Sequence, residues 1–330
     1  MWENRGRVPA RPRANLAWMV GAALLVALVV LVATHLGEAE RFAALVERAE
    51  PSWLAVALGL QVATYACSGG IWHVVAKAAG YRLRIRDLAR LAVEKLTVDQ
   101  LVPAAGMAGN LVVVRSMARL GLPAGVAMEA VLVDLLAFYG AFALVTAVAM
   151  VVLAIHHDVT TVIVGLVGGF LVVLAVVPLT IDWLLRHRAW KPPPWLARRR
   201  AVAGLLDVVA RVRPAQVRRP RLLAKAIGLQ TGVFVLDAAT LWVMLRAVGV
   251  AIDPLTAFVG LVVASLAGLL SLLPGGLGSF EAGCTAALTL LGVPLEAALT
   301  GTLMLRGLTL WLPLVPGMVL ARHELRGAEA

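Results

Sequence analysis

The sequence predicts an all-α polytopic membrane protein, with about six transmembrane helices and two re-entrant helical hairpins in an inverted-topology repeat. Three observations predict it. The 330-residue chain is 61% hydrophobic, and its mean hydropathy is +0.89. It contains several apolar stretches of about 20 residues each, the length that crosses a hydrocarbon core of ~30 Å. Most of its basic residues lie in three segments between apolar stretches, as they do in cytoplasmic loops.

Composition excludes several other classes. The formal net charge of +11 comes mainly from the loops, and no nucleic-acid recognition motif accompanies it, so nucleic acid is not an expected partner. Cys67 and Cys284 lie in apolar surroundings without CxxC spacing or nearby histidines. Neither a disulfide framework nor a metal site is therefore expected. No cofactor is expected either.

The first half of the chain contains four predicted spans. Residues 16–36 follow four arginines and form an apolar run longer than a signal-peptide core, so we expect a retained first span with a cytoplasmic N-terminus. The second span, 53–79, returns to an arginine-rich loop. The third and fourth spans, 123–153 and 160–185, then cross outward and back.

A re-entrant hairpin is predicted between the second and third spans. Its arms, 88–102 and 110–120, flank the segment PAAGMAG. Each arm reaches only ~22 Å at 1.5 Å per residue, so neither crosses the bilayer alone. A hairpin that enters and leaves on the cytoplasmic side also keeps Arg115 and Arg119 inside. One long kinked helix is the alternative, and it would place these arginines outside.

The second half is expected to repeat this order after a basic cytoplasmic linker. Part of the linker is predicted to lie on anionic headgroups as an amphipathic helix; a solvated loop is the alternative. Both termini are then cytoplasmic, and residues 1–330 form one membrane domain. Its predicted parts are repeat A (53–154), an extra span (160–185), the linker (186–221) and repeat B (222–320), with the fifth span at 222–248, the second hairpin at 255–273 and 277–291, and the last span at 295–320.

The spacing of four prolines indicates the internal repeat. Pro103 and Pro123 are twenty residues apart, as are Pro274 and Pro294, and the two pairs are related by an offset of 171 residues. One extra span between the copies makes them enter the membrane from opposite sides. Inverted repeats with broken helices at the midplane form the binding sites of many secondary transporters. Chance spacing in apolar sequence is the alternative.

The break SLLPGGLGSFEAG marks the predicted site. Interrupted backbone is tolerated at membrane depth only where protein or a wet cavity satisfies it. The helix that begins at this break points its N-terminal N–H groups toward the midplane, which favours an anionic group such as a phosphate. Glu281 and Arg306 are expected at a similar depth and can be neighbours; the alternative is that they only staple the hairpin to the last span. The predicted substrate-binding residues here are Pro274, Gly275, Gly276, Gly278, Glu281 and Arg306.

Further polar residues are predicted to share this depth. Charges near a helix centre cost about 2.5–3.5 kcal/mol on insertion scales and usually face a partner or a polar cavity. For Asp237 a purely structural role is the stronger alternative. The additional predicted site residues are Asp134, Asp237, Asn110, Lys95 and Asp99.

The segment LLPGGLGSFEAG, followed by an arginine in the last span, resembles the lysylphosphatidylglycerol synthase transmembrane, or flippase-like, family. VPAAGMAGNLVVVR resembles the family's earlier loop, with Pro-Ala-Ala in place of Pro-Gly-Gly and Asn110 at the acidic position. The resemblance implies functional roles for Gly275, Gly276, Gly278, Glu281 and Arg306. It also implies lipid translocation. Members of the synthase branch carry a soluble aminoacyl-transfer domain that we do not expect here, so aminoacyl-lipid synthesis by this chain alone is not expected.

These features favour a flippase-like protein of the cytoplasmic membrane that translocates a phospholipid or lipid-linked headgroup. A second hypothesis is a non-transporting membrane partner that recruits a lipid-modifying enzyme or a glycosyltransferase through the basic linker. A membrane enzyme comes third, because HExxH, nucleophile-elbow and phosphate-loop motifs are missing from the sequence. The expected partners are membrane lipids and, at the cytoplasmic face, an enzyme.

Overall fold

The structure is a computed structural model that describes residues 50–101, 107–156, 161–187, 212–213, 217–271 and 274–313. Every regular element in these ranges is helical, as the sequence predicts. The expected first span at 16–36 lies outside the described residues.

Four helices in the described part of the chain are long and apolar enough to cross a bilayer. They are α3 (Pro51–Ala78), α6 (Ala124–His156), α7 (Thr161–Arg186) and α11 (Pro220–Ala247). At ~1.5 Å per residue, each exceeds the ~30 Å core. The protein is therefore a multi-pass membrane protein, and these helices match the predicted second to fifth spans to within three residues at each end.

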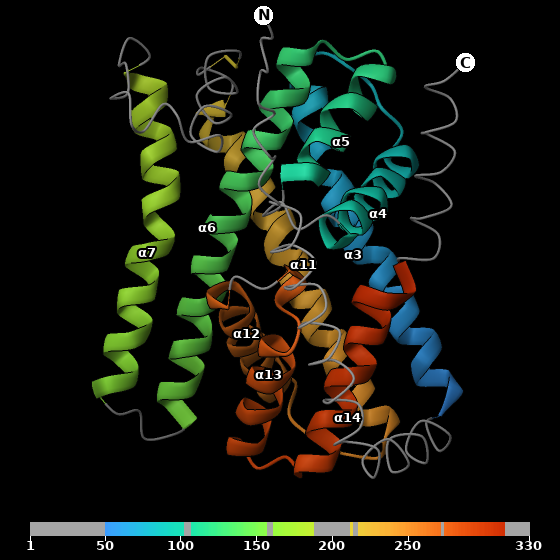
Figure 1. Ribbon diagram of the computed structural model, residues 1–330, viewed down its shortest axis with the longest axis vertical. Coiled ribbons are helices and arrows are strands. Elements are labelled where there is room, and N and C mark those ends of the chain that lie inside the picture. The colour runs from blue at the N-terminus through green and yellow to red at the C-terminus, as the bar shows by residue number, and fades with distance from the viewer. Residues whose placement is uncertain are drawn as a thin grey trace, which may run out of the picture. The chain divides into compact units, whose positions relative to one another are not determined.

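Four shorter helices form two pairs. α4 (Ile85–Leu101) packs on α5 (Met107–Arg119), and α12 (Pro254–Leu270) packs on α13 (Ser279–Leu290). The longest of these helices has 17 residues, or ~26 Å. Figure 1 shows the α4–α5 pair in the upper half of the view and the α12–α13 pair in the lower half. Each pair therefore consists of arms too short to span alone.

The last described segment starts as α14 (Leu295–Arg306) and continues as a π-helical turn over Gly307–Trp311. The sequence predicts the last span here, over 295–320. The π-helical turn begins directly after Arg306; such turns are rare and occur frequently at functional sites. The part of the predicted span beyond residue 313 lies outside the described residues.

Matching local features recur in the two halves. α3 and α11 each end at a glycine with positive φ, Gly80 at 91° and Gly249 at 84°. Just beyond these glycines, a ring nitrogen binds a backbone carbonyl: His73 Nδ1 lies 3.1 Å from the oxygen of Leu83, and Trp242 Nε1 donates to Ile252 over 3.0 Å. The paired residues are 169 positions apart.

After the hairpin tips the spacing changes. Gly121 and Gly292, with φ of 87° and 90°, are 171 positions apart. The offset of 171 predicted from the prolines is therefore two residues too long for the segments before the tip. The second tip contains two additional residues, which account for the difference.

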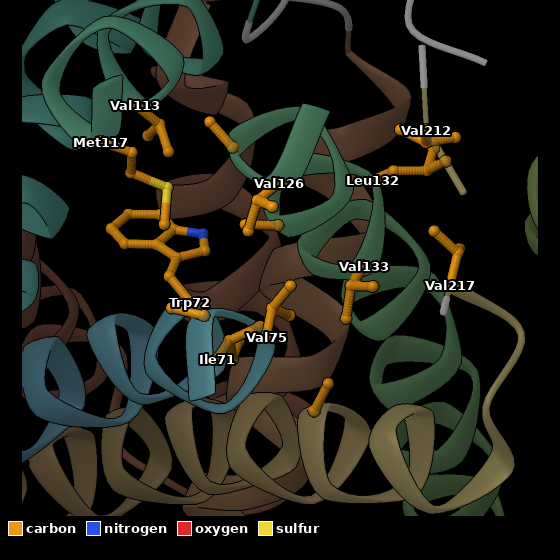
Figure 2. Packing of buried hydrophobic residues seen from close by; sticks show 14 of the residues in the cluster. Ile71, Trp72, Val75, Val113, Met117, Val126, Leu132, Val133, Val212 and Val217 are labelled. Atoms are coloured by element: carbon orange, nitrogen blue, oxygen red, sulfur yellow. The ribbon is translucent and has the colours of Figure 1, made fainter. Parts of the chain in front are cut away.

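The apolar contacts join α3, α5 and α6 in one cluster. Figure 2 shows Trp72 of α3 beneath Met117 and Val113 of α5, with Val126 of α6 beside them. Trp72 is 1% exposed. Because lipid tails are as apolar as these side chains, close packing rather than transfer from water holds such helices together.

One close approach in this cluster requires a glycine. A Cβ atom at Gly69 of α3 would lie 2.8 Å from backbone atoms of Leu88 and Ala89 in α4. No flexible side chain can move away to relieve this contact. The missing side chain therefore sets the distance between α3 and α4.

Gly69→Ala should lower the free energy of unfolding by about 1–3 kcal/mol, because the added methyl overpacks the contact between α3 and α4. The measurement is the thermal unfolding midpoint of the purified protein in detergent. Gly59→Ala on the same helix is the control, because a Cβ there meets no atom within 4 Å. Equal midpoints for the two variants would contradict the packing assignment.

Candidate functional site

A cavity of about 630 Å³ lies among the described helices. It is bordered by α3, α4, α6, α11, α12 and α14, and by the tip of the second hairpin. The predicted site residues on its wall are Lys95, Asp99, Asn110, Asp134, Asp237, Gly275 and Arg306. The structure thus brings most of the predicted polar residues to one space.

The cavity wall draws matching positions from the two halves. Before the tips the offset is 169, and after them it is 171. α3 contributes Gln61, Thr64, Tyr65 and Ser68, and α11 contributes their counterparts Gln230, Val233, Phe234 and Asp237. Asp134, Leu135 and Phe138 of α6 have the counterparts Leu305, Arg306 and Thr309. The wall residues from the two halves occupy equivalent positions, whereas their side chains differ in charge.

One charged cluster holds the first hairpin. Lys95 Nζ lies 3.5 Å from Asp99 Oδ2 and 4.0 Å from Asp134 Oδ2. Lys95 and Asp99 are one turn apart on α4, so both face the same side. Asp99 Oδ1 also accepts the Gly109 N–H over 2.9 Å. This bond satisfies an N–H in the first turn of α5, which would otherwise lack a helical partner.

Gly109 is required by this arrangement. A Cβ there would lie 2.5 Å from the Asp99 carboxylate. The sequence places Asp99 in the site, but it does not reveal that its carboxylate caps the second arm.

A second charged cluster holds the other hairpin. Arg306 Nε donates to Glu281 Oε1 over 2.6 Å, and Glu281 Oε2 accepts the Gly278 N–H over 2.7 Å. Arg306 Nη2 donates to the Gly275 carbonyl over 2.5 Å. The guanidinium also lies over the Phe280 ring, 4.6 Å from its centroid. Arg306 and Glu281 are therefore neighbours, as expected, and together they fix the start of α13.

The glycines of the second tip differ in what they contact. Gly275, Gly276 and Gly278 all have positive φ, at 63°, 64° and 80°, a region that favours glycine. Gly275 lines the cavity. A Cβ at Gly276 would lie 2.9 Å from the Gly268 Cα atom of α12. Of these three predicted substrate-binding glycines, only Gly275 borders the cavity. The predicted site residue Pro274 has its side chain outside the described side chains.

Asp237 is held by uncharged groups from α3. Gln61 Nε2 donates to Asp237 Oδ1 over 3.0 Å and to Thr240 over 3.1 Å. Thr64 Oγ1 donates to Asp237 Oδ1 over 3.4 Å. Gln61, Thr64 and Ser68 line the cavity but are not among the site residues predicted from the sequence. Their spacing of three and four residues, on one face of an apolar helix, is the signal that could have identified them.

Neither a cofactor nor a metal is assigned to this cavity. Among the described residues, no group of three or more His, Cys, Asp or Glu side chains is arranged to hold a metal ion.

The family follows from the sequence comparison. The profile described as lysylphosphatidylglycerol synthase TM region matches residues 18–317. The chain belongs to this family. A search of curated proteins finds no match. The lysylphosphatidylglycerol synthase TM region of this chain contains every described helix, and therefore both hairpins and the whole cavity wall.

Arg306→Met should lower the free energy of unfolding by about 3 kcal/mol, because it leaves the Glu281 carboxylate without its counter-charge. Both side chains are largely buried, with 11% of Arg306 and 17% of Glu281 exposed. The double variant Glu281→Gln/Arg306→Met should lose less than the sum of the two single changes, since it removes both charges. Denaturant unfolding of the four proteins measures this coupling. Strictly additive losses would argue against a direct ion pair.

Proposed function

We propose that this protein is a flippase-like membrane protein that moves a phospholipid or lipid-linked headgroup across the cytoplasmic membrane. The observation that carries the proposal is a cavity bordered by both hairpins, whose wall carries charged and polar side chains inside a bundle of apolar helices. Charged side chains near the helix centre cost about 2.5–3.5 kcal/mol each and usually line substrate or ion pathways. A pathway for a polar headgroup accounts for five of them on one wall: Lys95, Asp99, Asp134, Asp237 and Arg306.

The proposed architecture is an inverted-topology repeat with two re-entrant hairpins and six spans. The recurring glycines and ring-nitrogen contacts support two related copies. The short arms support hairpins that turn inside the bilayer. The basic segments of the sequence favour cytoplasmic termini. Such repeats place a midplane site that opens alternately to each side.

Arg306 is the proposed contact for a headgroup phosphate. An arginine has five N–H donors, and the bonds to Glu281 and Gly275 use two of them. The remaining donors can bind phosphate oxygens, as guanidinium groups commonly do. Lys95 and Asn110 on the opposite hairpin, and the carboxylates of Asp134 and Asp99, are proposed to bind other polar parts of the headgroup. The movement breaks no covalent bond, so we assign no catalytic residue.

Arg306→Ala and Glu281→Ala should abolish lipid movement in reconstituted vesicles, because both changes release the hairpin tip and the first also removes the phosphate contact. The measurement follows a fluorescent phospholipid that becomes accessible to a membrane-impermeant quencher. Arg246→Ala is the matched control, since Arg246 lies over the Trp242 ring at 5.2 Å and is not on the cavity wall. Ser265→Trp, which fills the cavity without changing a charge, should also block movement. Wild-type rates of lipid movement in Arg306→Ala, Glu281→Ala and Ser265→Trp would refute the proposal.

A second candidate function is a non-transporting membrane partner for a lipid-modifying enzyme or a glycosyltransferase. The observation that favours it is the anchoring of the linker's described end. The backbone N–H and Nε of Arg213 both donate to Glu129 Oε1, at 2.9 and 3.1 Å. Arg218 Nε lies 2.9 Å from Asp182 Oδ1. A basic linker fixed to α6 and α7 can present a stable surface to a partner.

Replacing Arg198, Arg199 and Arg200 by glutamine in one variant removes three positive charges. If the partner function holds, the enzyme should no longer co-purify with this variant. These arginines lie outside the described residues. The same variant should retain wild-type lipid movement if transport holds, because the cavity is unchanged. Affinity purification followed by mass spectrometry, beside the vesicle assay, separates the two functions.

A further inference from the structure

Asp237 differs from the other carboxylates of the site in lacking a positive partner. Asp99 and Asp134 lie near Lys95, and Glu281 binds Arg306. Among the described residues, no lysine, arginine or histidine lies within ion-pair distance of Asp237. Its side chain nevertheless borders the cavity, toward the middle of α11.

The hydrogen bonds to Asp237 are directed at one oxygen. Gln61 Nε2 and Thr64 Oγ1 both donate to Oδ1. Gln61 is 3% exposed and is held in place by its second bond to Thr240. No hydrogen bond from the described residues reaches Oδ2. Side chains of α3 therefore bind one oxygen of a carboxylate that lines the cavity, and the other oxygen has no donor among the described residues.

A buried hydroxyl without a partner lies in the same region. Tyr65, one residue after Thr64, also lines the cavity. Its hydroxyl oxygen is buried and has no hydrogen-bond partner among the described residues. A buried polar atom left unsatisfied is unfavourable, so this hydroxyl is suited to a bond that forms when the surrounding side chains change position.

The groups around Asp237 favour the binding of a proton over the binding of a metal ion. The groups that approach Asp237 are N–H and O–H donors, whereas alkali and alkaline-earth ions require several converging oxygens. A carboxylate buried without a counter-charge is relieved most directly by binding a proton. Water in the cavity can deliver that proton to Oδ2.

We propose that Asp237 is a proton-binding site whose protonation is coupled to the movement of the lipid headgroup. The coupling rests on the proposed transport function, whereas the proton site does not. The ionised carboxylate accepts stronger hydrogen bonds than the neutral acid, so it ties α3 to α11 through Gln61 and Thr64. Protonation weakens this cross-link and permits the two helices to move.

Other titratable groups face the same space. On the elements packed against α11, they are Tyr65 of α3, Asp134 of α6 and Arg306 of α14. The two residues that α12 contributes to the cavity wall, Leu261 and Ser265, are both uncharged. Lys95 and Asp99 face the cavity from α4. A variant that tests Asp237 must therefore leave these other titratable groups unchanged.

Infrared difference spectroscopy on the purified full chain in lipid bilayers tests the proton site directly. Lowering the pH should produce a protonated-carboxyl band in the wild type that Asp237→Asn removes. Asp253→Asn is the matched control, because Asp253 caps the exposed start of α12 and should leave the band in place. Gln61→Leu keeps the carboxyl but removes a donor, and should move the pH range over which the band appears. A band that survives in Asp237→Asn, or that Gln61→Leu leaves unmoved, would overturn the proposal.

Vesicles with an imposed pH difference test the coupling. The wild type should move a fluorescent phospholipid severalfold faster in one gradient direction than in the other, and an ionophore should remove that difference. Asp237→Asn should give equal rates in both directions. Wild-type movement that ignores the gradient would overturn the coupling. If no lipid moves and the infrared band is still lost in Asp237→Asn, the transport function fails while the proton site stands.

Discussion

A bilayer offers no water to satisfy an interrupted helix or an isolated charge, so this protein must satisfy both internally. The two hairpins meet this constraint in related ways. Asp99 accepts an N–H in the first turn of α5, and Glu281 accepts one at the start of α13. Lys95 and Arg306 then neutralise these carboxylates. Backbone breaks and charges thereby stabilise each other.

The residues that satisfy the tips also border the cavity. Arg306 binds the Gly275 carbonyl and the Glu281 carboxylate while its guanidinium remains on the cavity wall. A ligand bound by the remaining donors of Arg306 would share one guanidinium with the bonds that hold the tip. Its binding would then be coupled to the position of the hairpin through this residue.

The contact between α3 and α11 combines close packing with polar bonds. Gly232 of α11 faces Cys67 of α3, with 3.6 Å between the sulfur and the position a Cβ would occupy. The bonds from Gln61 and Thr64 to Asp237 cross the same contact. Polar bonds between membrane helices contribute only modest energy on average, so their main effect here is to fix the register of the two helices.

The sequence alone determined the helical class, the bounds of most elements and the family, because apolar length and Pro/Gly breaks are local signals. It also predicted charges that share one depth, since helical rise converts residue number into depth, and these charged residues line one cavity. The spacing of Gln61 and Thr64 could have placed them on one face of α3, but it could not show that they bind Asp237, because a neutral polar residue within an apolar run does not reveal its partner. Only the tertiary structure decided which carboxylate has a counter-charge and where the repeat offset changes. Those properties depend on distances between residues far apart in the chain.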